Sequence, residues 1–160
     1  RDFKSEQIKD EELDAILEAG TYAPTGMGKQ SPIMIAVQNK DDIAELERIN
    51  AEIFGKPDSN PFYGAPTVIV VLADADRPTA VYDGSLVMGN LLNAAASVGV
   101  DSCWIHRAKE TFEREDGRTL LKKWGIEGNY IGIGNCVLGY AASSPSPALP
   151  RKTGYITKVK

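Results

Sequence analysis

The stretch "DGSLVMGNLLNAAASVGVDSCWIHR" (residues 83–107) decides how this chain folds. Together with the residues before it, the stretch predicts a long, mostly apolar helix over 80–99 that tolerates Gly84 and Gly89. Its small residues allow close packing against a neighbouring element. Gly99 ends the helix, and "DSCWI" (101–105) predicts a short strand. The chain is therefore expected to pass directly from a buried helix into a strand of a sheet.

Further strands and helices are expected on both sides of this stretch. The predicted strands are 33–37, 67–73 and 130–140, and the predicted helices are 10–20, 41–55 and 109–125, the last of them broken near Asp116-Gly117. Asp10 is the expected cap of the first helix, and Gly55 ends the second. Residues 142–154 read as an extended linker, and 155–160 alternate like an edge strand. One sheet with helices around it follows, in an α/β or α+β fold.

The composition indicates a single globular domain over residues 1–160. The chain is 42% apolar and 25% charged, with a net charge of -4, an ordinary mixture for a chain that buries a core. The acidic balance argues against a nucleic-acid partner, and no apolar run approaches the roughly 18 residues of a membrane span. Cys103 and Cys136 are expected to be buried free thiols in a reducing cytoplasm. One histidine and no CxxC pair predict no metal site.

The stretch "APTGMGKQSP" (23–32) has the glycines and lysine of a phosphate-binding loop. Only Gly28-Lys29 fits the P-loop motif, because Ala23 stands in place of its first glycine and Gln30 in place of its hydroxyl residue. The stretch also runs from a helix to a strand, whereas a P-loop runs from a strand to a helix N-terminus. On its own residues it is better explained as a turn that uses glycine at positive φ.

Several stretches resemble, in order, the motifs of the nitroreductase-like flavoprotein family. "LEAGTYAPTGMGKQSP" (17–32) is similar to the family's helix end A-x-x-A-P-S-x-x-N-x-Q-P-W, and 83–107 is similar to its long helix followed by S-C-W-I. The other similar stretches are "RDF" (1–3), "FYGAPTVIVVLAD" (62–74), "NYIGIGNCVLGYA" (129–141) and "PALPRK" (147–152). The resemblance covers nearly the whole chain. It implies an α+β fold with a single mixed or antiparallel central sheet flanked by helices.

The resemblance also implies that FMN binds noncovalently at the interface of a homodimer, and that residues 142–160 belong to the dimer. Arg151 and Lys152 match a basic element near the FMN phosphate, and Arg1 matches a basic residue near the N1–O2 edge of the flavin ring. Each could instead be an ordinary exposed cation, and residues upstream of Arg1 could complete the phosphate site. The other positions that match flavin-contacting ones are Pro24, Thr25, Gly26, Met27, Gln30, Asn50 and Asp83.

The segment after the strand 101–105 matches the part of the family that faces flavin N5. A backbone N–H of Trp104, Ile105, His106 or Arg107 would lie against N5, with His106 the donor by position and the expected catalytic residue. The His106 side chain could also be a surface histidine, and Trp104 could pack on the ring or in the core. Arg107 stands where glycine is frequent in the family, which leaves the substrate class open.

The implied function is an FMN-dependent oxidoreductase with a ping-pong mechanism. NADH or NADPH would deliver hydride to flavin N5 and leave, and a nitroaromatic, a quinone or a similar small acceptor would then take the electrons. The physiological acceptor and the choice between NADH and NADPH stay open. Two alternatives remain at this point: a non-catalytic flavin-binding or storage protein, and a structural domain that binds no flavin.

Overall fold

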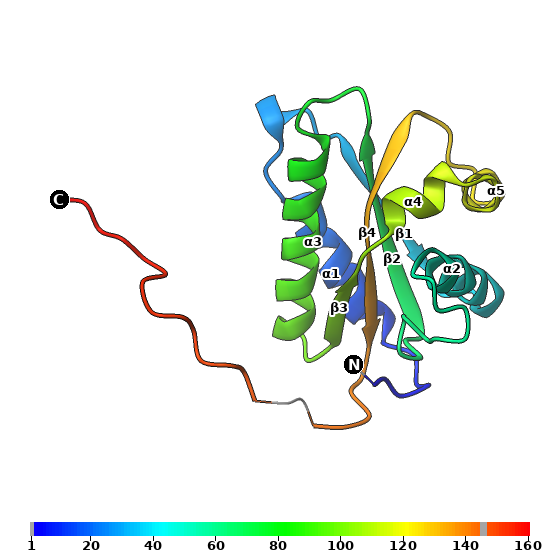
Figure 1. Ribbon diagram of the computed structural model, residues 1–160, viewed down its shortest axis with the longest axis horizontal. Coiled ribbons are helices and arrows are strands. Elements are labelled where there is room, and N and C mark those ends of the chain that lie inside the picture. The colour runs from blue at the N-terminus through cyan, green and yellow to red at the C-terminus, as the bar shows by residue number, and fades with distance from the viewer. Residues whose placement is uncertain (1, 145–146) are drawn as a thin grey trace.

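Four antiparallel strands form the centre of the molecule, in the order β1–β2–β4–β3. They are β1 (Pro32–Val37), β2 (Thr67–Asp74), β3 (Asp101–Ile105) and β4 (Tyr130–Gly139). The computed structural model in Figure 1 describes residues 2–144 and 147–160. β2 and β4 lie in the middle of the sheet, and β2 is buried along its length up to Ala73. This explains why β2 reads as a nearly continuous apolar run in the sequence.

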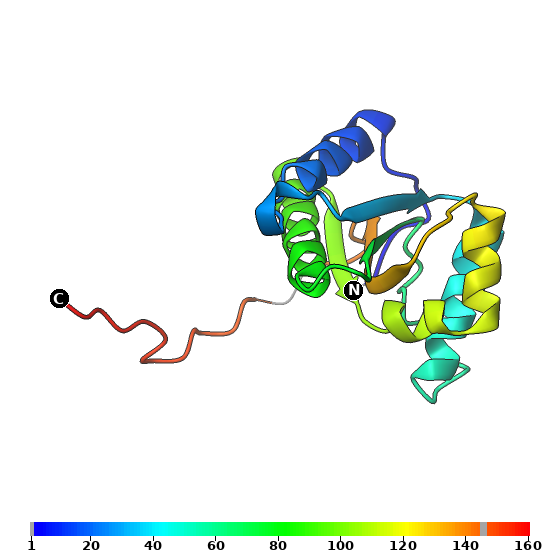
Figure 2. The same cartoon turned by 90° about the horizontal axis from the view of Figure 1, so that it is seen from above.

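Helices cover both faces of the sheet (Figure 1, Figure 2). One layer holds α1 (Asp10–Thr21) and α3 (Ala80–Ser97), and the other holds α2 (Lys40–Ile53), α4 (Ala108–Glu113) and α5 (Glu115–Lys123). Successive residues of β2 point to opposite faces of the sheet and contribute to two hydrophobic cores. Ile69 and Val71 pack in the core under α1 and α3, whereas Val68 and Val70 pack in the core under the other helical layer. The predicted α+β fold, with an antiparallel central sheet flanked by helices, is confirmed. Among the described residues no helix is long and apolar enough to cross a membrane.

The ends of the helices differ from the predicted ones by one or two residues, with two informative exceptions. Lys9, rather than Asp10, is the N-cap of α1, and its backbone N–H is bound by the Glu12 carboxylate at 3.0 Å. The break between α4 and α5 falls at Arg114, before the predicted Asp116-Gly117. The extended backbone of Arg114 separates the two helices, and Gly117 lets the start of α5 pack against α4, because a Cβ at this position would overlap the backbone carbonyl of Thr111.

The predicted edge strand at 155–160 is wrong. These residues form no strand, and the whole C-terminal tail (residues 147–160) is exposed. The tail runs away from the body of the molecule in both views (Figure 1, Figure 2). An alternating pattern becomes a strand only when a neighbouring strand receives its backbone hydrogen bonds. Within the part of the chain that the structure describes, the tail has no such neighbour.

The N-terminal segment lies against the end of β4. Phe3 forms an antiparallel bridge with Ala141, and the N–H of Lys4 donates to the carbonyl of Tyr140 at 2.9 Å. The N–H of Phe3 also donates to the carbonyl of Tyr63 at 3.3 Å. The start of the described chain is therefore tied both to the sheet and to the connection between α2 and β2.

Candidate functional site

The turn after β3 is held in place by one buried side chain of α2. Asn50 is completely buried; its Nδ2 donates to the carbonyl of His106 at 2.8 Å, and its Oδ1 accepts from Nε of Arg107 at 3.0 Å. Arg107 has a left-handed backbone, with φ of 78°, which is unfavourable for a residue other than glycine. The two hydrogen bonds to Asn50 offset part of this cost. They fix the direction in which the backbone at 106–107 points.

A cavity of about 420 Å³ opens beside this turn. Its walls come from the turn and from the connection between α2 and β2, and they consist of Phe54, Lys56, Ser59, Asn60, Pro61, Tyr63 and residues 103–107. Lys56 Nζ lies 5.1 Å from the centre of the Phe54 ring, and Arg107 Cζ lies 4.5 Å from it. Among the described residues neither cation forms an ion pair. One end of the cavity therefore combines an aromatic ring with uncompensated positive charge.

A second hollow, of about 390 Å³, lies between the starts of α3 and α4 and also borders Trp104 and His106. The rings of Trp104 and His106 are 6.1 Å apart, tilted by 49°. Trp104 packs against the core beneath α1 and α3, so the two sequence interpretations of this residue do not exclude each other. Its indole N–H is buried and has no hydrogen-bond partner in the described structure. Buried hydrogen-bond donors without a partner are rare in proteins, so the Trp104 indole is an unusual feature of the residues that border this hollow.

Asp83 holds the second group of predicted residues, the loop 23–31. Its buried carboxylate accepts hydrogen bonds from the backbone N–H of Gly26 at 2.9 Å and from the hydroxyls of Ser31 and Thr79 at 3.2 and 2.9 Å. The loop contains a short 3₁₀ helix, Gly26–Gly28. Asp83 therefore faces the loop from within the protein and does not line the cavity beside Arg107.

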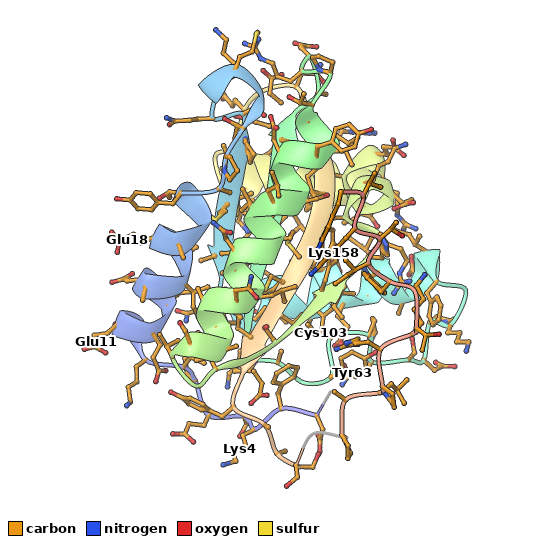
Figure 3. The ribbon with its side chains drawn as sticks, turned by 90° about the vertical axis from the view of Figure 1, so that its left-hand side faces the viewer. Lys4, Glu11, Glu18, Tyr63, Cys103 and Lys158 are labelled. Atoms are coloured by element: carbon orange, nitrogen blue, oxygen red, sulfur yellow. The ribbon has the colours of Figure 1, made fainter. Side chains whose placement is uncertain are left out.

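The loop and the turn do not meet within one chain. Thr25 and Gln30 line a separate cavity of about 140 Å³, and no loop residue borders either hollow beside residues 103–107. Figure 3 shows the loop on one side of α3 and the labelled Cys103 and Tyr63 on the other. The exposed part of the loop includes Pro24, and Met27 exposes 85% of its surface. The predicted cofactor residues of the loop and those of the turn therefore lie apart within one chain.

Several predicted residues do not line the cavity beside Arg107 within the described part of one chain. Arg1 lies outside the described residues, and Arg151 and Lys152 are exposed on the tail, away from the turn. Asn50 was expected to touch the ring, but it is buried and does not line the cavity. Asn60 lines the cavity instead. Asn60 lies in the connection "KPDSNPFYGAP" (56–66), whose Pro, Gly and Asn content suggested only a loop. The connection also contains a cation, an amide and aromatic residues within a few positions, and this combination could have indicated a binding site.

The two thiols also differ from expectation. Cys136 is buried, and burial raises the pKa of its thiol to about 12, so the thiol stays protonated and inert. Cys103 is only half-buried and lines the cavity beside Arg107, whereas burial was predicted for both. Asn135, which pairs with Ile105 across the sheet, was missed altogether. Its amide is buried, and neither of its polar atoms has a partner in the described structure.

Comparison with known proteins agrees with this fold. The Nitroreductase family model matches residues 1–140. A crystal structure of a nitroreductase with bound FMN from Bacteroides fragilis is 31% identical, with a TM-score of 0.91 over 100% of this chain and 92% of that chain. A nitroreductase with bound FMN from Desulfitobacterium hafniense is 30% identical, with a TM-score of 0.88 and the same coverage of 100% and 92%.

A curated protein of Archaeoglobus fulgidus, assigned by inference as an NADH dehydrogenase/NAD(P)H nitroreductase, is 29% identical over 146 residues. The match spans 88% of this chain and 78% of that protein. The family model, the ordered motifs and the antiparallel sheet between two helical layers lead to the same conclusion. This chain belongs to the nitroreductase family.

Proposed function

We propose that this chain is an FMN-dependent oxidoreductase that takes its electrons from NADH or NADPH. Two similar crystal structures contain FMN, and the name of the Archaeoglobus relative pairs a nitroreductase with NAD(P)H. The observation that carries the proposal is the cavity beside residues 103–107, with a backbone wall, aromatic side chains and cations at one end. Its volume of about 420 Å³ lies within the range usual for cofactor sites.

The residues around the cavity fit a flat ring with one polar edge. Phe54 and Tyr63 supply apolar surface, and the amide of Asn60 suits the alternating donors and acceptors of a pyrimidine edge. Lys56 and Arg107 place positive charge at the same end, which favours electron uptake by a ring bound there. When bound, FMN would supply the redox chemistry, accepting a hydride at N5 and passing two electrons on.

The turn would orient that ring. Asn50 fixes His106 and Arg107, so the backbone N–H groups at these positions are available in a defined direction before a cofactor arrives. We assign the backbone N–H of His106 as the donor toward N5, with Trp104 and Ile105 forming the surface beneath the ring. The ring of His106 is exposed and stands at the border of both hollows, where a second substrate would enter.

We propose that the site is completed by a second copy of this chain. Pro24, Thr25, Gly26, Met27 and Gln30 lie away from the turn in one chain and would reach the cofactor of the partner. Exposed apolar side chains surround this loop and the start of α3: Tyr22, Met27, Val81, Tyr82 and Leu86. Exposed large apolar side chains on neighbouring elements are typical of an interface. Arg151, Lys152 and Arg1 are assigned to the phosphate, which an arginine can hold with two parallel hydrogen bonds.

The open side of the cavity beside the turn favours a ping-pong reaction, in which the nicotinamide leaves before a nitroaromatic, quinone or similar acceptor enters the same place. The first test is the visible absorption spectrum of the protein after addition of FMN and removal of the excess. We expect a retained flavin spectrum that bleaches on anaerobic addition of NADH or NADPH and returns when a nitroaromatic or a quinone is added. A retained spectrum that neither donor bleaches would indicate a flavin-binding protein without this activity, and a colourless protein would refute the proposal.

A further inference from the structure

A further cavity, of about 440 Å³, lies between α2 and the N-terminal segment. We name it the α2 groove; its walls are Ser5, Gln7 and Gln38, the α2 residues Lys40, Ile43, Ala44 and Glu47, and the residues Phe62 and Gly64 to Pro66. It shares no residue with the cavity beside Arg107. It belongs to the α2 layer, on the face of the sheet opposite α1 and α3 (Figure 1). The exposed apolar residues of the loop and α3 are therefore on the other side of the molecule.

The groove contains a half-buried carboxylate with no cationic partner. Oε1 of Glu47 accepts the backbone N–H of Phe62 at 2.8 Å. No hydrogen bond or ion pair among the described residues uses its other oxygen. Loss of solvation raises the pKa of the Glu47 carboxyl, and the Phe62 N–H offsets this only in part. A cation bound at the free oxygen would restore the interaction that burial has removed.

The opposite wall offers further unused polar groups. Nε2 of Gln38 donates to the buried Thr67 hydroxyl, which donates in turn to Oε1 of Gln7, both at 3.2 Å. These contacts leave the Gln7 amide N–H groups and the Gln38 amide oxygen without a partner in the described structure. Lys40, at the first turn of α2, adds an ammonium group that forms no ion pair among the described residues. Hydrogen-bond donors and acceptors thus line a cavity whose floor is apolar, formed by Ile43 and Phe62.

The spacing along α2 sets the shape of the molecule that would fit. Lys40 and Glu47 are seven residues apart on one helix face, a separation of about 10 Å at 1.5 Å per residue. Ile43 lies between them on the same face. A matching molecule has a cation at one end, an acceptor at the other and an apolar body between them.

We propose that the α2 groove is a second small-molecule site, which takes a ligand with a cationic amine at Glu47, an apolar body over Ile43 and Phe62, and a carbonyl or carboxylate group toward Gln7 and Lys40. The site is independent of the flavin cavity, so it stands whether or not the proposed oxidoreductase activity is found. Its ligand is recognised mainly by the positive charge at Glu47, unlike a flat ring held by its edge.

The test uses three probes of similar shape: 4-(aminomethyl)benzoate, benzylamine and 4-methylbenzoate. Isothermal titration calorimetry of the full chain, with and without excess FMN, measures the affinity of each probe, and the backbone amide NMR signal of Phe62 reports contact at Glu47. We expect 4-(aminomethyl)benzoate to bind at one site and to shift this signal. Benzylamine should bind a few-fold more weakly, because the exposed Lys40 contributes little, and 4-methylbenzoate at least about tenfold more weakly.

Glu47→Gln is the decisive variant, because the amide keeps an oxygen for the Phe62 N–H but loses the charge. It should weaken both amine probes at least about tenfold and leave 4-methylbenzoate unchanged. Glu11→Gln on α1, an exposed residue labelled in Figure 3, is the matched control and should change nothing.

Amine probes that bind the Glu47→Gln variant as tightly as the wild type would overturn the proposal. So would probes that shift signals of residues 103–107 in place of Phe62, or wild-type protein that shows no saturable binding at millimolar concentrations. The order of affinity among the three probes needs no variant, so the proposal can be refuted even if Glu47→Gln fails to fold.

Discussion

At the scale of single residues, Asp83 shows how a buried carboxylate can shape a site that it does not enter. Its three hydrogen bonds hold a loop in which Met27 and Gln30 have left-handed backbones, with φ of 53° and 50°. Such conformations cost residues other than glycine about 1 kcal/mol or more each. Asp83 therefore helps to hold the shape of the loop, together with the hydrogen bond from the Gln30 N–H to the Thr25 hydroxyl, and this shape presents Pro24 to Met27 at the surface.

We predict that Asp83→Ala weakens FMN binding by at least about tenfold, because the loop relaxes once Gly26, Ser31 and Thr79 lose their acceptor. Asp83→Asn should have a smaller effect, since its amide oxygen can still accept the Gly26 N–H. FMN titration followed by flavin fluorescence measures both. Ser97→Ala is the control on the same helix, because the Ser97 hydroxyl only donates to a carbonyl of its own helix. Unchanged FMN affinity in Asp83→Ala would show that the loop does not touch the cofactor.

At the scale of elements, α2 is the helix on which the site depends. Asn50 binds the turn, while Asp42 accepts hydrogen bonds from Lys123 and, at 2.9 Å, from the indole N–H of Trp124 at the end of α5. Further along, Arg48 and Glu52 pair with Asp116 and Arg114 across the break between α4 and α5. One helix thus locates the turn and the two short helices that follow it. These contacts are why short helices, which are marginal alone, are ordered here.

The Asp42 contact predicts a pH dependence of stability. Its hydrogen bonds, first to Lys123 and then to Trp124, lower the pKa of the Asp42 carboxyl. A folded-state pKa below the unfolded value of roughly 3.9 means that the stabilisation is present above that pH and is lost as the pH falls through the folded pKa. Asp42→Asn should therefore lower the free energy of unfolding by about 1–2 kcal/mol near neutral pH, after allowance for the exposed Lys123.

Urea denaturation near neutral pH and again at roughly pH 3 measures this difference. The gap between Asp42→Asn and the wild type should narrow at the lower pH. Asp41→Asn, at the exposed neighbouring position in the same first turn, is the control and should show a smaller change at both pH values, since it removes only the interaction with the helix dipole. An equal gap at both pH values would mean that the Asp42 charge contributes nothing to the tie between α2 and α5.

At the scale of the whole molecule, charge separates the C-terminal tail from the body. The tail carries four of the 18 basic residues and none of the 22 acidic ones, so residues 1–146 keep 14 basic against 22 acidic residues, a net charge of -8. The tail also exposes Leu149, Tyr155, Ile156 and Val159. A basic segment with apolar side chains complements the charge of an acidic body. Here the segment extends away from the body of its own chain (Figure 1). We therefore assign it to the partner subunit in the proposed dimer.

Removal of the tail after Ser144 should leave the fold of the body intact, because no hydrogen bond found among the described residues joins the two. It should raise the dimer dissociation constant and weaken FMN binding, and added salt should narrow the difference from the full chain by screening the charges. Analytical ultracentrifugation and FMN titration measure these effects. Arg151→Ala in the full chain isolates the phosphate contact, with an expected loss of about 1.5–3 kcal/mol. Truncation without effect on either quantity would contradict the assignment.

The elements were largely predictable because their patterns are local. The runs 67–73 and 130–140 indicated buried strands, and the structure places both in the middle of the sheet. Caps and breaks were less predictable: Lys9 caps α1 through a contact with Glu12, and the break at Arg114 is fixed by contacts with α2. The strand predicted at 155–160 failed for a related reason, because alternation describes the side chains and carries no information about a pairing partner.

By itself the sequence determined the type and order of the main elements up to β4, the family and the two stretches, 23–32 and 103–107, around which the site is proposed. Only the tertiary structure decided which buried polar side chains form hydrogen bonds that hold those stretches in place. In the folded chain Asn50 and Asp83 are buried and hold the turn and the loop, and Lys56 and Asn60 line the cavity. Glu47 lies in the α2 groove. Periodicity follows from the backbone of one segment, whereas the partner of a polar group is chosen by elements that meet only after folding.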